Sequence, residues 1–167
     1  MGYTHYWNFE PNKVKDTEQL RKKFKKASRQ IKSFSGWLLN KGIVIKGGHG
    51  EGKPIFNDTE IWFNGDASEH LDHETFSMHW SRPTTWGTHN DFCKTARKPY
   101  DLLVCFALLT FAEIFPEAFE FSSDGTMDEH EWQQGVEYYE LYTGKTAKIP
   151  QSWRKQTTVL TPLKYAV

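Results

Sequence analysis

A basic segment directly in front of a strongly apolar helix is the first place where this sequence could bind a ligand. Residues 92–101 have the sequence FCKTARKPYD, in which Lys94, Arg97 and Lys98 carry positive charge. A helix N-terminus attracts anions through its free N–H groups and its dipole, although Pro99 removes one of the donors. The segment therefore predicts a phosphate site at the start of the helix.

The same cations could instead pair with acidic side chains in a structural network. Residues 99–144 contain ten Asp or Glu residues and no Lys or Arg. The basic segment thus stands at a boundary between opposite charges, and both interpretations remain open at this point.

The aromatic N-terminal residues 3–9 predict a strand whose two faces differ in chemistry. Alternate residues of a strand point to opposite faces, so that Tyr3, His5, Trp7 and Phe9 share one face, and Thr4, Tyr6 and Asn8 share the other. One face must be core, and the other could border a cavity where rings stack on a nucleobase. The alternative is that all the rings only pack.

Histidines and carboxylates crowd one short stretch of the chain, namely Glu69, His70, Asp72, His73 and Glu74, with His79 nearby. Zinc needs ligands that converge from several segments, and no known zinc-binding spacing occurs here, so we predict no metal and no cofactor. Two H-x-T/S motifs, residues 73–75 and 79–81, resemble those of two-histidine phosphoesterases, in which they lie far apart; here they are too close. No Ser-His-Asp order stands out, and no residue is assigned as catalytic.

Two glycine-containing stretches complete the candidate sites. Residues 47–54, GGHGEGKP, lack the spacing of known phosphate loops and predict a mobile loop or lid. Ser123-Asp124-Gly125 fits a turn, and Asp124 could stand at the rim of a pocket.

The elements expected around these residues predict an α+β fold. Helices are expected at 16–40, where Asp16 is an N-cap, at 99–115, which is apolar nearly all round, and at 126–144, whereas strands are expected at 3–9, 43–46, 59–63, 75–80 and 118–121. This order favours a mostly antiparallel sheet with about three helices packed on one face. Residues 1–167 are expected to form a single domain, with a basic tail at 145–167 of uncertain structure.

The composition limits which binding partners and which cellular compartment we expect. With 21 basic and 21 acidic residues, the chain has no net charge to drive broad or sequence-specific nucleic-acid binding. Two cysteines form no disulfide framework, and the sequence lacks a signal peptide and any apolar run long enough for a membrane. A cytoplasmic location without membrane contact follows as the expectation, and a homo-oligomer is compatible with it.

Three motifs resemble an uncharacterised family of small phage and bacterial proteins. They are GYTHYW at residues 2–7, FCKTARKPYD at 92–101 and SSDG at 122–125. The resemblance covers most of residues 2–143 and carries no catalytic assignment. It implies a location in the bacterial host cytoplasm, where small phage proteins that capture the nucleotide signals of antiviral defence are a plausible role by analogy.

The leading hypothesis is that the protein binds, and sequesters without turnover, a phosphate-bearing, nucleotide-derived small molecule. The expected ligand-binding residues are Lys94, Thr95, Arg97 and Lys98 for phosphate, Tyr3, His5, Trp7 and Tyr100 for base or ribose, and Asp124 at the rim. The first alternative is a hydrolase of a nucleotide phosphoester or glycosidic bond, with His5, His73 or His79 as acid-base and Asp124 orienting. The second is a protein-interaction module that uses the Lys-rich helix 17–38.

Overall fold

The computed structural model describes residues 2–82 and 91–153, and these form an α+β fold. The helices are α1 (Thr17–Leu39), α2 (Asp101–Ile114) and α3 (His130–Thr143), with short 3-10 turns at Pro11–Lys13 and Ala67–Glu69. The strands are β1 (Thr4–Phe9), β2 (Ile55–Phe56), β3 (Glu60–Phe63), β4 (Phe76–His79), β5 (Asp91–Lys94) and β6 (Phe119–Ser123). The predicted fold class is confirmed.

The strands are divided between two antiparallel sheets. One has the order β5-β1-β6 and the other has the order β2-β3-β4. The predicted strand at 43–46 is reduced to one bridge between Lys46 and Asn64, whereas the first residues of the basic segment form the unpredicted strand β5. In β5 the apolar Phe92 is exposed and Cys93 is buried, so this strand lacks the apolar-polar alternation that identifies β4.

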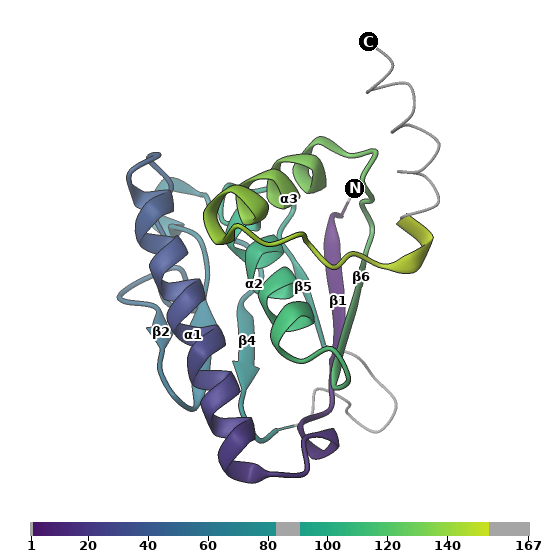
Figure 1. The fold of residues 1–167 in the computed structure, drawn as a ribbon. Helices are drawn as coiled ribbons and strands as arrows, with labels where there is room; N and C mark the ends of the chain where they lie inside the picture. Colours follow the sequence, from purple (N-terminus) through teal and green to yellow (C-terminus); the bar gives the residue numbers. More distant parts are fainter. Residues whose placement is uncertain (1, 83–90, 154–167) are drawn as a thin grey trace.

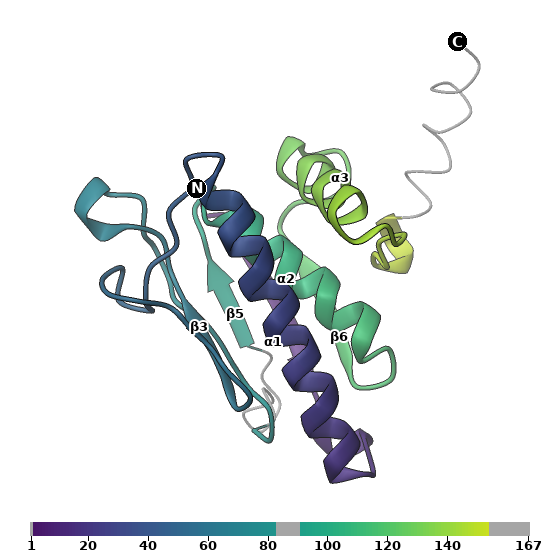
Figure 2. The same cartoon turned by 60° about the vertical axis from the view of Figure 1, so that its left-hand side comes forward.

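Helix α2 is the centre of the core and lies between α1 and α3 (Figures 1 and 2). Its sequence is apolar on every side, and twelve of its fourteen residues are buried. The Phe106 ring stacks on Phe34 of α1 at 3.9 Å between centroids, and Phe111 packs against Phe9 of β1 at 5.6 Å. The three helices lie on the side of the β5-β1-β6 sheet to which Tyr3, His5 and Trp7 point.

Helix α1 follows its sequence pattern closely. The Asp16 carboxylate accepts hydrogen bonds from the backbone N–H groups of Glu18 and Gln19, as an N-cap should. The residues of the predicted apolar stripe are buried, and they include Leu20, Phe24 and Ile31. Within the described part of the chain, no helix is long and apolar enough to cross a membrane.

The first residues of the predicted C-terminal tail are packed against the domain. The ammonium groups of Lys145 and Lys148 pair with Glu113 of α2, and the buried Trp153 ring lies 4.8 Å from that of Trp132. The rest of the tail, residues 154–167, lies outside the described residues.

Candidate functional site

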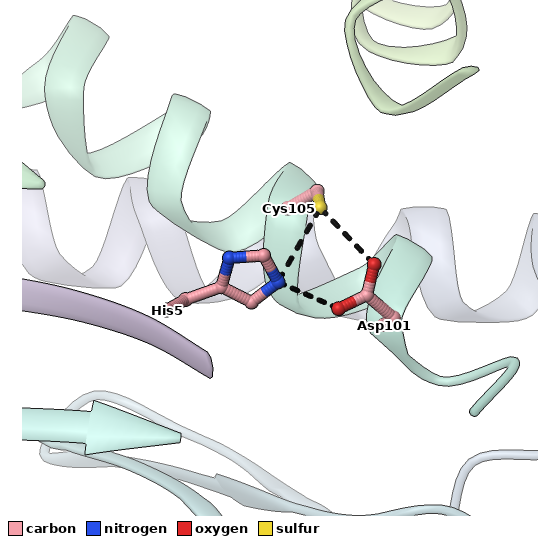
Figure 3. Close-up of side chains that lie close together, drawn as sticks. All are labelled: His5, Asp101 and Cys105. Carbon is pink, nitrogen blue, oxygen red and sulfur yellow. Dashed lines mark hydrogen bonds and ion pairs between the residues drawn. The ribbon is translucent and has the colours of Figure 1, made fainter. Parts of the chain in front are cut away.

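The three sequence motifs converge on one buried histidine. His5 lies on β1, the central strand of its sheet, opposite Cys93 of β5 on one side and Ser123 of β6 on the other. The start of α2 brings Asp101 to the same ring (Figure 3). Each motif therefore contributes one member of a cluster whose residues are far apart in the sequence.

Both ring nitrogens of His5 are hydrogen-bonded. Nε2 lies 2.6 Å from Oδ1 of Asp101, and Nδ1 lies 2.8 Å from Oγ of Ser123. His5 is completely buried and Asp101 is 3% exposed, whereas Ser123 is half-buried at the end of its strand. The arrangement links the Ser123 hydroxyl to a buried carboxylate through an imidazole.

Asp101 is surrounded by hydrogen-bond donors. The Thr95 hydroxyl donates to its Oδ1 at 2.5 Å, and the Cys105 thiol donates to its Oδ2 at 3.5 Å. Burial raises the pKa of the Cys105 thiol well above its usual value, and the charge of Asp101 raises it further, so that the thiol keeps its proton. Because Asp101 lies in the first turn of α2, the helix dipole also favours a carboxylate there.

The bonds to Ser123 fix the direction of proton donation. Its Oγ accepts a hydrogen bond from Nε1 of Trp132 at 3.0 Å and one from the backbone N–H of Gly125 at 3.1 Å. A hydroxyl oxygen has two lone pairs, and both are now used. These bonds leave the Ser123 hydroxyl proton to point at Nδ1 of His5, and the tautomer with its proton on Nε2 donates to Asp101.

The same cluster contains three potential metal-binding groups that the sequence did not indicate. Ligand atoms of His5, Asp101 and Cys105 all lie within 4.8 Å of one another. A metal would need a free lone pair on Nε2 of His5 and a thiolate on Cys105. In the present arrangement these atoms are hydrogen-bonded to one another, and binding of a metal would have to release both protons.

The cations of the basic segment are engaged with other parts of the chain. Arg97 pairs with Glu131 at 2.8 Å and Glu129 at 3.7 Å, and its guanidinium lies 4.2 Å above the Tyr3 ring. The Lys98 ammonium donates to the carbonyl of His70. The Arg97 contacts correspond to the alternative in which cations of this segment pair with acids.

Lys94 and Thr95 also have internal partners. The Lys94 backbone N–H donates to the Glu74 carboxylate, and a Cβ added at Gly2 would meet the Lys94 side chain at 2.7 Å. Thr95 is fully buried against Asp101. The Thr95 hydroxyl is therefore held inside the chain, and Lys94 uses its backbone N–H to bind residue 74.

The first N–H groups of α2 are used by the turn that precedes it. The N–H groups of Asp101, Leu102 and Leu103 donate to the carbonyls of residues 98, 99 and 100, respectively. Ala96 (φ 51°) and Arg97 (φ 61°) adopt left-handed conformations that let the chain turn so tightly. These three N–H groups are therefore used within the chain and are not free to bind an anion at this helix end.

The predicted base-binding rings are mostly core. Tyr3, Trp7 and Tyr100 are each 1% exposed, although Trp7 also lines a small hollow of about 180 Å³ next to Tyr6 and Asn8. The Tyr100 hydroxyl donates to the carbonyl of residue 74.

Asp124 contributes to the strand edge. Its carboxylate accepts hydrogen bonds from the Thr4 backbone N–H at 3.0 Å and the Tyr6 hydroxyl at 3.3 Å. The side chain is exposed, but these bonds give it a structural role in joining β1 to the turn after β6.

The start of α2 does border a cavity, but different residues line it. Its volume is about 670 Å³, and its lining comprises Asn40, Lys41 and Ile43 after α1, Pro99 and Leu102 at α2, and Gln134 and Tyr138 of α3. The Lys41 ammonium lies 4.7 Å from the Trp37 ring and 5.8 Å from the Tyr138 ring. No sequence pattern joins these positions, because only packing of the three helices brings them together.

The remaining candidate segments are held by local contacts. The carbonyl of Gly48 in the glycine-rich loop accepts hydrogen bonds from the side chains of Asn64 and Thr75, so the loop is tied to the β2-β3-β4 sheet. On the Lys-rich helix, Arg21 lies over Trp80 and Lys25 pairs with Asp58. These cations therefore take part in packing α1 against its neighbours.

In comparisons with known proteins, no family model, no curated protein and no solved structure matches the chain.

Proposed function

We propose that the protein binds a phosphate-bearing, nucleotide-derived small molecule in the cavity between the end of α1, the start of α2 and α3. The observation that supports this is the lining itself, which combines a cation, an aromatic ring and two amides around about 670 Å³. Small-molecule sites are commonly about 300–1,000 Å³ and combine apolar walls with a few polar groups.

Each lining group has a role in such a ligand's recognition. Lys41 supplies the positive charge for phosphate, and the Tyr138 ring offers a stacking surface for a base. The side-chain amides of Asn40 and Gln134 both donate and accept, as the edge of a base requires. Ile43 and Leu102 provide the apolar wall.

The lining favours capture over turnover. Among the described residues that form the cavity there is no carboxylate, histidine or thiol to act as an acid or base. By analogy, phage proteins that counter antiviral defence sequester signalling nucleotides. Such a role needs a site that binds the nucleotide but has no catalytic groups.

The test is calorimetric titration of the purified chain with a panel of mono-, di- and cyclic nucleotides. We expect one ligand class to bind, and Lys41→Ala to weaken its binding about tenfold, which equals about 1.4 kcal/mol. Lys22→Ala is the matched control, because its 75% exposed side chain lies on the outer face of α1 and away from the cavity.

Mass spectrometry of the ligand released by heating separates capture from hydrolysis. Capture predicts recovery of the intact ligand at one equivalent or less. Product in excess of one equivalent would exclude a sequestering role, and equal affinities of wild type and Lys41→Ala would exclude this cavity.

A further inference from the structure

The hydrogen-bond chain from Ser123 through His5 to Asp101 has the order of groups that activates a serine for nucleophilic attack. Such sites place a base within hydrogen-bond reach of the hydroxyl and an orienting carboxylate on the other ring nitrogen. Here the two distances are 2.8 Å and 2.6 Å. The ring is used in the opposite sense from the serine proteases, since Nδ1 faces the hydroxyl and Nε2 faces the carboxylate.

We infer that Ser123 is a base-activated nucleophile that attacks the carbonyl carbon of a neutral carboxylic ester. Ser123 is half-buried between the exposed residues Ser122 and Asp124, whereas its base and the carboxylate are buried. This inference is independent of nucleotide binding, because none of these residues lines the cavity at Lys41.

The proton positions already match the first step. Ser123 donates to a lone pair of Nδ1, so the base is unprotonated where it must accept the proton. Asp101 holds the opposite N–H and stabilises the imidazolium that forms on transfer. The N–H groups of Trp132 and Gly125 donate to Oγ at 3.0 and 3.1 Å and hold the hydroxyl in place beside His5.

The full cycle consumes one water for each ester. The Oγ–carbon bond forms as the Ser123 proton moves to Nδ1 of His5, and the ester C–O bond then breaks as this proton passes to the leaving alkoxide. Water next attacks the acyl group on Ser123, gives a proton to His5 and releases the acid, and the proton returns to Oγ. Because both lone pairs of Oγ accept hydrogen bonds at rest, the longer bond from Gly125 must open before attack.

The charges around the turn select a neutral substrate over a phosphoester. Asp124 is exposed beside Ser123, and Glu129 and Glu131 both pair with Arg97 of the basic segment. Three carboxylates against one guanidinium leave this surface negative. An anionic phosphate would be repelled, whereas an uncharged ester would not.

The experiment treats the wild-type chain with a fluorophosphonate probe, which reacts with activated serines and releases fluoride, and maps the adduct by peptide mass spectrometry. We expect one adduct, on Ser123, that does not form on chain unfolded in urea. An adduct elsewhere, or none on Ser123, would overturn the inference without relying on any variant.

Variants then test the base. Ser122→Ala, on the exposed neighbouring residue, should label like wild type, and Ser123→Ala should not label. His5→Gln, with its fold checked by circular dichroism, should label about 10²–10⁴ times more slowly, because that is the usual contribution of a general base. Equal rates in a folded His5→Gln chain would show that Ser123 is not activated by His5.

Two chromogenic esters test the substrate class. p-Nitrophenyl acetate should release nitrophenol with a burst of one equivalent, whereas p-nitrophenyl phosphate should remain intact. Hydrolysis of the phosphate alone would overturn the neutral-ester assignment. Lys22→Ala, at the exposed control position on α1, should label and react like wild type. Labelling and ester hydrolysis are measured without nucleotide, so failure of the nucleotide proposal leaves these results unaffected.

Discussion

His5 connects three segments through one side chain, and both of its ring nitrogens have hydrogen-bond partners. The ring bonds Asp101 and Ser123, and Asp101 also receives the hydroxyl of Thr95 and the thiol of Cys105. A buried polar network of this kind is costly when any member loses its partner. The hydrogen bonds that make this cluster a candidate catalytic site therefore also contribute to the stability of the fold.

Removal of the Thr95 hydroxyl tests this structural contribution at the scale of one residue. Thr95→Val keeps the shape of the side chain but removes one donor from a buried carboxylate, so we expect a loss of about 1.5–3 kcal/mol in the free energy of unfolding. Urea denaturation measures it. Thr146→Val, at an exposed threonine, is the control and should stay within about 0.5 kcal/mol of wild type. A similarly small change at Thr95 would mean that Asp101 does not depend on this donor.

At the scale of elements, α2 serves both stability and the site. Its buried faces hold α1, α3 and the β5-β1-β6 sheet together, and its first two turns place Asp101 and Cys105 at His5. The preceding turn, with two left-handed residues, directs Thr95 to the same carboxylate. Helix packing and site geometry are therefore set by one element.

Truncation of a core leucine on α2 tests its central position. Leu109 is fully buried, and Leu109→Ala should cost about 2–5 kcal/mol through lost contacts and a cavity. Leu141→Ala on α3, where the side chain is 75% exposed, should change the stability by less than about 0.5 kcal/mol. Chemical denaturation of both variants gives the comparison, and equal costs would contradict the burial of α2.

At the scale of the whole molecule, the two sheets are joined by a small set of contacts. The backbone N–H of residue 94 in β5 donates to the Glu74 carboxylate, and the Tyr100 hydroxyl donates to the carbonyl of residue 74 at 2.6 Å. The rings of Trp7 and Phe76 pack across the junction at 4.9 Å between centroids. These contacts predict that both sheets unfold as one unit.

Urea unfolding, monitored by far-UV circular dichroism and by tryptophan fluorescence, tests whether the two sheets unfold together. One domain predicts coincident transitions. Tyr100→Phe removes one hydrogen bond at the junction and should lower the free energy of unfolding by about 0.5–1.5 kcal/mol by both probes. Two separate transitions would show instead that the β2-β3-β4 sheet unfolds on its own.

The sequence by itself determined the elements whose signals are local. The cap at Asp16 and its apolar stripe locate α1, and the apolar run before Pro116 locates α2, because capping and helical periodicity act within a few residues. The aromatic residues 3–9 likewise predicted β1, and the α+β class followed from the order of elements.

Only the tertiary structure decided which chemical groups meet. His5 is 96 residues from Asp101 and 118 residues from Ser123, and in the sequence Ser123 is an ordinary turn residue. The cavity at Lys41 likewise depends on how three helices pack. Strand register and helix packing are set by long-range burial, and a local pattern does not encode which distant residue will lie opposite. The sequence therefore supplied the three motifs, and folding alone brought them to a single histidine.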